Sequence, residues 1–212
     1  MTTTAPARPS AGAALAPLTR QTLAGLRMLL LLTLVTGLLY PMAVTGIAQV
    51  SMRWQANGSL LADDGSRVTS VQDSIGSSLI GQDFTGARWF HSRPSAAGWD
   101  TRASAGSNLG PLNPDLLAAV EARRAAVAAE ERVDPASVPA DALTASASGL
   151  DPDISPEYAR LQVARVAREN GLAEADVAAL VDDSIVGRDL GFLGEPRVDV
   201  LRLNLALARM IT

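Results

Sequence analysis

The feature that most constrains this chain is an uncharged apolar run that begins at Met28 and ends at Met52. Its 25 residues include seven Leu, and about 20 apolar residues are enough to cross a bilayer core as a helix. Leu and Val in this number favour insertion by roughly 3 to 6 kcal/mol. A cleavable signal peptide is the alternative, with Gly46 and Ala48 spaced like a cleavage site, but its apolar region would be only about 7 to 15 residues long. We therefore predict a transmembrane helix over residues 28–50.

The charges on either side of this run predict the orientation of the chain. Three arginines precede the run, whereas all 22 acidic residues lie at Asp63 or later. Arginine beside a first span marks the cytoplasmic side, so residues 1–27 are expected to form a disordered cytoplasmic stub. The predicted fold is a single N-terminal transmembrane helix plus one α+β extracytoplasmic domain over residues 53–212. Such a chain would be a single-pass protein of the cell inner (plasma) membrane, in contact with lipid.

Composition excludes several kinds of chemistry. The outer segment carries 15 Arg against 22 acidic residues, a net charge of −7 (15 − 22), which gives no support to nucleic-acid binding. The chain has no Cys and no Lys, and His91 is its only histidine, so thiolate metal sites and Lys-containing phosphate loops are absent. We expect no catalytic site, no metal site and no bound cofactor. Two alternatives stay open: an anchored hydrolase that uses Ser146 or Ser148 with His91, and an anchored solute-binding module.

Turn residues and helix caps divide the outer segment. Turn clusters on both sides of Leu60 and Leu61 predict short strands, and residues 78–82 predict a further strand. Asn before Pro114 and Ser before Pro156 are strong helix starts. Helices are predicted over about 113–132, 155–170 and 174–185. The last apolar stretch, residues 198–211, has mixed spacing, so a strand followed by a helix and a helix alone are both open.

Two polar stretches, residues 93–114 and 144–152, have no helical or strand period. A long loop in a compact domain is uncommon and is usually functional if it is ordered. Gly106 and Gly110 permit close backbone approach, as a loop that docks onto another subunit or lines an ion entrance would need. The alternative is that Asn and Ser satisfy the loop's own backbone. The interface candidates are Arg93, Ser104, Ser107, Asn108, Thr144, Ser146, Ser148 and Asp151.

The predicted membrane helix also carries residues that suit contact with a second helix. Thr36, Gly37 and Tyr40 lie at helical spacing, and Pro41 frees a backbone carbonyl near the middle of the membrane. The candidates for packing in the membrane are Thr36, Gly37, Tyr40, Pro41, Thr45 and Gln49.

Several strings in these segments resemble one known family. Residues 93–97 (RPSAA), 104–114 (SAGSNLGPLNP) and 144–152 (TASASGLDP) are similar to signature blocks of the C subunit of the Kdp potassium-transporting P-type ATPase, the KdpC family. Trp89 and Trp99 depart from the family, which more often has Tyr at these positions. Further similar strings, in the family's order, are Thr36-Gly37, Tyr40-Pro41, Thr45, Gln49, Gly76-Ser77, residues 79–82, residues 194–198, Leu201 and Leu203-Asn204.

The resemblance implies a non-catalytic accessory subunit of a high-affinity, ATP-driven potassium uptake complex. Its implied partners are a potassium-binding channel-like subunit, a P-type ATPase subunit and a small membrane peptide. The family has been described as a catalytic chaperone that raises the ATP affinity of the pump subunit. Because the predicted orientation places the domain away from cytoplasmic ATP, we assign ATP and potassium to the complex rather than to this chain. The outer domain is expected to cap or brace the outer mouth of the ion-conducting subunit.

Overall fold

The structure is a computed structural model that describes residues 11–211, with side chains from Thr19 onward. The chain divides into two compact units, Met1–Ala56 and Asn57–Thr212. Each unit is described by itself below.

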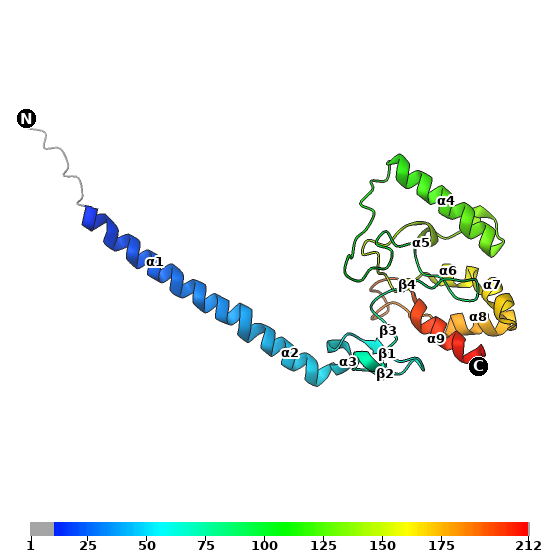
Figure 1. Cartoon of the computed structure of the whole chain (residues 1–212), viewed down its shortest axis with the longest axis horizontal. Coiled ribbons are helices and arrows are strands. Elements are labelled where there is room, and N and C mark those ends of the chain that lie inside the picture. The colour runs from blue at the N-terminus through cyan, green and yellow to red at the C-terminus, as the bar shows by residue number, and fades with distance from the viewer. Residues whose placement is uncertain (1–10, 212) are drawn as a thin grey trace, which may run out of the picture. The chain divides into compact units, whose positions relative to one another are not determined.

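The first unit is a helix with one irregular turn (Figure 1). It comprises α1 (Ala11–Leu34), a π-helical turn η1 (Val35–Leu39), α2 (Tyr40–Ser51) and the short α3 (Arg53–Ala56). The stretch Thr19–Ser51, 33 residues long, is apolar enough to cross a membrane, and none of its most apolar window is buried in the protein. An unburied apolar surface of this length suits a chain that associates with a membrane.

The helix already includes Ala11, the first described residue, well before the predicted start at residue 28. Residues 11–27, which the sequence predicted as part of a disordered stub, are rich in Ala and Leu. These residues have high helix propensity, so a preformed membrane helix can extend through them. The remainder of the predicted stub, residues 1–10, lies outside the described residues.

The second unit contains a small antiparallel sheet with strand order β2-β1-β3. Its strands are β1 (Leu60–Leu61), β2 (Arg67–Val68) and β3 (Gly76–Ser77), and the turn η2 (Val71–Asp73) lies between the last two. The short strands around Leu60 are thus confirmed, whereas the strand predicted over residues 78–82 is wrong. The sheet ends at Ser77, and the Gly81 N–H donates to the Leu150 carbonyl at 2.8 Å instead.

Helices supply most of the regular secondary structure of the second unit. A second antiparallel pair joins β4 (Asp153–Ile154) to β5 (Val198–Asp199), with Ile154 opposite Val198. The helices and the remaining short turn are α4 (Pro114–Glu131), η3 (Pro135–Ser137), α5 (Ala140–Leu143), α6 (Pro156–Leu161), α7 (Val163–Asn170), α8 (Glu174–Asp183) and α9 (Val200–Ile211). The unit is therefore a mixed domain of helices and small sheets.

Local capping explains where the helices start. The Asn113 side chain accepts a hydrogen bond from Asp115 N–H at 2.8 Å, and the Ser155 hydroxyl accepts one from Tyr158 N–H at 3.0 Å. Gly171 ends α7 in the left-handed conformation with φ 67°, which favours glycine. Both predicted starts are confirmed, and residues 198–211 form a strand followed by a helix.

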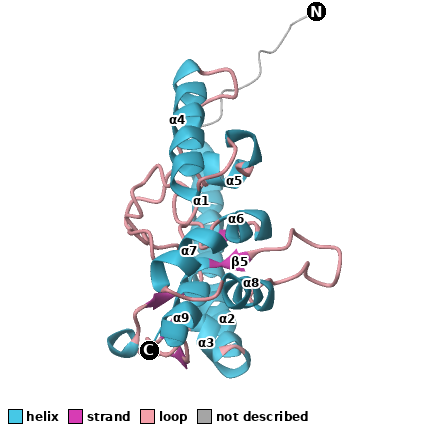
Figure 2. Cartoon of the chain, turned by 90° about the vertical axis from the view of Figure 1, so that its right-hand side faces the viewer, coloured by secondary structure: helices cyan, strands magenta, loops and turns pink. Residues whose placement is uncertain are grey.

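The core lies among α7, α8 and α9, which gather around β5 (Figure 2). Val177 and Val181 of α8 are fully buried in one cluster with Val166 of α7 and Leu203 of α9, which have the same zero exposure. Phe90 joins this cluster from a segment with no regular structure. Burying side chains of this size contributes about 1.5 to 3 kcal/mol each, so Phe90 fastens its segment to the core.

Candidate functional site

The two polar stretches predicted as interface loops pack against each other. We call residues 93–113 the first loop and residues 144–152 the second loop. Ser95 Oγ donates to the Gly149 carbonyl at 2.6 Å, and Ser104 Oγ donates to the Ser148 carbonyl at 3.0 Å. The Ser146 N–H donates to the Pro94 carbonyl at 3.2 Å. Side chains of one loop thus satisfy backbone groups of the other, which holds two segments without secondary structure in one arrangement.

An ion pair joins the same two loops. Arg93 Nη1 lies 2.9 Å from Asp151 Oδ2, and both side chains are about three-quarters buried, with exposures of 25% and 29%. The other oxygen of Asp151 accepts a hydrogen bond from Asp153 N–H at 3.1 Å, and Arg93 Nη2 reaches the Thr144 carbonyl at 3.5 Å. A charge-assisted contact that is partly shielded from solvent contributes more to the stability of the fold than a surface ion pair does.

Two glycines permit the close approach of these loops. A Cβ atom at Gly106 would lie 2.9 Å from the Ala147 carbonyl oxygen, and one at Gly149 would lie 2.6 Å from the Ala105 carbonyl oxygen. Gly149 also has φ +68°, a conformation that side chains disfavour. The glycines are therefore required by packing between the loops. In contrast, Gly110 has no atom within 4 Å of an added Cβ among the described residues.

Some of the predicted interface residues form hydrogen bonds within this unit, whereas others are exposed on its surface. Arg93, Ser104, Ser148 and Asp151 take part in the contacts between the loops, while Thr144 Oγ1 caps α5 through the Ala140 carbonyl at 2.9 Å. Ser146 is buried, and its hydroxyl has no hydrogen-bond partner among the described residues. Ser107 and Asn108 are exposed, and Asn108 has φ 53°. Leu112, beyond them, is 90% exposed.

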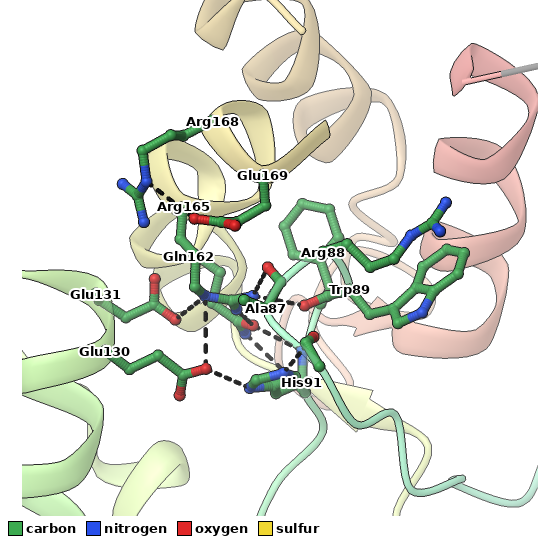
Figure 3. Close-up of polar contacts among 12 residues, drawn as sticks. Ala87, Arg88, Trp89, His91, Glu130, Glu131, Gln162, Arg165, Arg168 and Glu169 are labelled. Carbon is green, nitrogen blue, oxygen red and sulfur yellow. Dashed lines mark hydrogen bonds and ion pairs between the residues drawn. The ribbon is translucent and has the colours of Figure 1, made fainter. Parts of the chain in front are cut away.

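The segment just before the first loop is fixed by two carboxamide side chains, of which Figure 3 shows that of Gln162 beside His91. Asn204 of α9 accepts from Phe90 N–H and donates to the Phe90 carbonyl, both at 2.9 Å. Gln162 accepts from His91 N–H at 2.7 Å and donates to the His91 carbonyl at 3.2 Å. The two side chains take the place of a neighbouring strand, so this extended segment keeps its buried backbone groups paired.

A buried arginine completes this network (Figure 3). Arg165 of α7 is 1% exposed and donates from Nε to Glu131 of α4 at 2.9 Å. Its other nitrogens donate to the Trp89 carbonyl and to Gln162 Oε1, each at 2.8 Å. Burial raises the pKa of Glu131 and the Arg165 charge opposes this rise. Arg165 therefore links α4, α7 and the segment that leads into the first loop.

The geometry around His91 does not support the hydrolase alternative. Its Nε2 lies 3.2 Å from the Gly86 carbonyl and its Nδ1 lies 3.7 Å from Glu130 Oε1. Burial and the nearby Arg165 lower the pKa of His91. Ser148 Oγ instead accepts from Leu150 N–H at 3.1 Å. In the described part of the chain, no group of three or more His, Asp or Glu side chains could hold a metal ion.

Gln162, Arg165 and Asn204 were not predicted from the sequence as functional residues. Their signal was a polar side chain within an apolar stripe: Asn204 is three residues from both Leu201 and Leu207, and Arg165 is four residues after Leu161. A polar residue that is buried on a core-facing stripe must find partners. The identity of those partners depends on a segment far away in the chain, and spacing along one helix cannot reveal it.

The six packing candidates on the apolar helix Thr19–Ser51 lie in the π-helical turn η1 or after it. The π-helical turn brings Tyr40 N–H to the Val35 carbonyl, and Pro41 follows it without an N–H of its own. Thr36 Oγ1 donates to the Leu32 carbonyl at 2.7 Å, and Gly37, Tyr40, Pro41, Thr45 and Gln49 are exposed. An added Cβ at Gly37 would meet only Thr33, at 3.9 Å. The helix therefore does not itself require glycine there.

The structure defines a class of protein: a helix apolar enough to span a membrane, followed by a separate domain of helices and small sheets with two interlocked polar loops. The family model for the c chain of the K+-transporting ATPase, KdpC, matches residues 22–209. A relative from Kineococcus radiotolerans, a potassium-transporting ATPase KdpC subunit, is 55% identical over 196 residues, which cover 92% of this chain and 96% of the relative. The KdpC subunit of Mycobacterium tuberculosis is 51% identical over 195 residues, 90% of this chain and 99% of that one. The chain therefore belongs to the KdpC family.

Proposed function

We propose that this member of the KdpC family acts as a non-catalytic accessory subunit of a potassium-importing ATPase. Its outer unit lies on the extracytoplasmic side and braces the outer mouth of the ion-conducting subunit through the tip of the first loop. The partners are the potassium-binding channel-like subunit, the P-type ATPase subunit and the small membrane peptide of the complex.

The single observation that carries the proposal is how the two loops are built. Their contacts satisfy each other's backbone and fix both loops, yet Ser107, Asn108 and Leu112 remain exposed at the tip. A loop that served only its own fold would not need polar donors and an exposed Leu together at its tip. A loop whose base is fixed docks with a smaller loss of conformational entropy, which suits a bracing role.

The helix supports the membrane part of the proposal. All side chains of Tyr40–Ser51 except that of Ala48 are exposed, and Pro41, directly after the π-helical turn, has no N–H to offer to a carbonyl of the preceding turn. In a membrane such carbonyls favour a neighbouring helix that carries donors. We infer that the channel-like subunit supplies that neighbour. The arginines before the span favour a cytoplasmic N-terminus, which keeps this chain's folded domain apart from cytoplasmic ATP.

The experiment that tests this function is deletion of the gene and growth at graded potassium concentrations. Loss of growth that is confined to very low potassium, and is restored by the intact gene, supports the proposal. Normal growth of the deletion strain at very low potassium would contradict it. Co-purification in mild detergent then identifies the subunits that the tagged chain binds.

A further inference from the structure

The chain between α8 and β5 projects from the body of the second unit (Figure 2). We call residues 186–197 the arm. Val186 pairs with Arg197 in an antiparallel bridge at its base, and a second bridge joins Asp189 to Leu193 nearer its end. All but the last two residues of the arm are exposed, so its shape depends largely on its own contacts.

The end of the arm is entirely apolar. Residues 190–194, Leu-Gly-Phe-Leu-Gly, have no polar side chain, and we call them the arm tip. Leu190 is 82% exposed and Phe192 is 69% exposed, although burial of such side chains is favourable. Leu190 also has φ 54°, a backbone conformation that Leu adopts only at an energetic cost. Gly or Asn would form this turn more easily, so the turn displays a large apolar side chain that its own geometry does not require.

The backbone of the arm tip is largely satisfied within the arm. The N–H groups of Asp189 and Leu193 each donate to the other's carbonyl at 2.9 Å. Gly191 N–H donates to the Arg188 carbonyl at 3.1 Å, and Phe192 N–H donates to the Asp189 carbonyl at 3.3 Å. A backbone polar group without a partner is costly in an apolar environment. The arm tip can therefore leave water and keep these hydrogen bonds.

The charged side chains of the arm are paired. Arg188 forms an ion pair with Glu195 across the arm. Arg197 lies 3.3 Å from Asp153 of β4 and 3.9 Å from Asp189. The arm contains two Arg and two acidic residues, so its net charge is zero (2 − 2), and it lacks the basic cluster that attracts anionic lipid headgroups. Any affinity of the arm tip for another surface must therefore come from its apolar side chains.

We propose that the arm tip enters the interfacial region of a lipid bilayer. The same chain carries a helix that is apolar enough to span a membrane, so a bilayer is present wherever that helix is inserted. The tip of the first loop differs, because Ser107 and Asn108 offer hydrogen-bond donors and acceptors, which suit a protein partner. The arm tip offers apolar surface alone on a satisfied backbone, which suits lipid. This contact is additional to the bracing function.

The chain has no Cys, so a single introduced Cys can carry a reporter. Leu190→Cys is labelled with an uncharged, environment-sensitive fluorophore, and the full chain is reconstituted in phosphatidylcholine vesicles. Phosphatidylcholine that carries a spin label near the headgroup end of its acyl chain should quench this fluorophore about threefold more strongly than the same fluorophore on Ala136→Cys. Ala136 is an exposed residue of η3 in the same unit. Iodide in the water should quench the two fluorophores in the opposite order.

Matched variants separate the arm tip from the fluorophore. Phe192→Ser together with Leu193→Ser in the labelled chain removes the two neighbouring apolar side chains, so quenching by lipid should fall to the level of the Ala136→Cys label. Val71→Ser together with Leu79→Ser, which alter exposed apolar side chains elsewhere in the unit, should leave quenching unchanged. All four substituted side chains are exposed, and an unchanged melting temperature checks that each variant keeps its fold.

Equal quenching by lipid at Leu190→Cys and Ala136→Cys would overturn the proposal. Quenching that persists after the double substitution of Phe192 and Leu193 would also overturn it. A Leu190→Cys label that is shielded from iodide only in the assembled complex, without quenching by lipid, would overturn it and assign the arm tip to a partner subunit. Shielding that increases with protein concentration in detergent, again without quenching by lipid, would assign the arm tip to a second copy of the chain. None of these results depends on growth at low potassium, so failure here leaves the bracing function standing.

Discussion

Arg165 shows how one side chain can order a segment that has no secondary structure. It is 1% exposed and holds Glu131, Gln162 and the Trp89 carbonyl at once. Removing an arginine from such a pair leaves the carboxylate buried without compensation, which costs about 3 to 5 kcal/mol. The segment fixed in this way leads directly into Arg93 of the first loop.

We therefore predict that Arg165→Met lowers the free energy of unfolding by about 3 to 5 kcal/mol, measured by urea denaturation of the full chain in detergent. Arg168→Met, in the same helix but with a side chain that is 39% exposed, should change stability by less than about 1 kcal/mol. The double variant Glu131→Leu with Arg165→Met should recover much of the loss, because no lone charge remains buried. Equal losses of stability in Arg165→Met and Arg168→Met would mean that the buried Arg165–Glu131 pair stabilises the fold no more than the exposed Arg168 does.

Asn108 gives a prediction that separates docking from folding. Its side chain is exposed and its φ is 53°, a conformation that Asn tolerates and Gly adopts at no cost. Asn108→Gly should therefore leave the melting temperature of the full chain unchanged, whereas Asn108→Ala should lower stability by about 1 kcal/mol through backbone strain alone. Under the bracing proposal, Asn108→Gly should still reduce potassium transport by the complex. Transport at the level of the unaltered chain would remove Asn108 from the interface.

At the scale of elements, the sequence predicted best those structures that are specified locally. The caps at Asn113 and Ser155 act within one helical turn, so both helix starts could be read directly. The strand predicted over residues 78–82 failed because Gly81 N–H pairs with Leu150 of the second loop, a partner that is distant in the sequence. The contact between the two loops could not be predicted from the sequence for the same reason. Its residues were recognised, but the sequence left open whether they met each other or another subunit.

The β4–β5 pair carries a pH dependence. Asp153 faces Asp199 across the pair, and burial together with the Asp199 charge raises the pKa of Asp153 to about 6. The positive charges of Arg197, 3.3 Å from Asp153, and of Arg202 oppose this rise, whereas the charge of Asp151 adds to it. Burial also raises the pKa of Asp199. Because the folded pKa lies above the unfolded value of 3.8, the stability that protonated Asp153 contributes is present at pH 3.8 and is lost as the pH rises through about 6.

We therefore predict that Asp153→Asn removes part of this pH dependence. The free energy of unfolding of the unaltered chain should fall relative to that of Asp153→Asn between pH 4 and pH 7, by an amount on the order of 1 kcal/mol once solvent screening is allowed for. Asp183→Asn, which alters an exposed carboxylate on α8, should keep the dependence of the unaltered chain. Parallel curves for Asp153→Asn and the unaltered chain, measured by denaturation at several pH values, would contradict this assignment.

The π-helical turn η1 of the first unit leads us to predict a contact with another helix at Gly37. An added Cβ at Gly37 meets only Thr33, at 3.9 Å, so Gly37→Leu should not disturb the helix itself. If a partner helix packs closely there, Gly37→Leu should reduce co-purification of the membrane subunits several-fold while insertion stays normal. Gly46→Leu, at a position roughly on the opposite side of the helix and with no atom within 4 Å of an added Cβ in the described structure, is the matched control. Equal recovery of the complex with both variants would indicate that Gly37 faces lipid.

At the scale of the whole molecule, the two units place different demands on their surroundings. The first exposes apolar side chains along a helix that is 33 residues long from Thr19 to Ser51, and only a membrane or a partner can cover a surface of this size. The second buries its own core of Val, Leu and Phe90. The chain passes from the first unit into the second between Ala56 and Asn57.

The orientation of the whole chain provides the last prediction. Arg20 and Arg27 precede the apolar run and no acidic residue does, which favours a cytoplasmic N-terminus. A reporter that is active only in the periplasm, fused after Thr212, should therefore be active, and a reporter that needs the cytoplasm should be inactive at the same position. Replacing Arg8, Arg20 and Arg27 by Gln should reduce this bias, because it removes the positive charge that favours a cytoplasmic N-terminus, while Arg53 after the apolar run remains. Activity of the cytoplasmic reporter after Thr212 in the unaltered chain would reverse the assignment, and the first loop could then no longer brace the outer mouth of a channel.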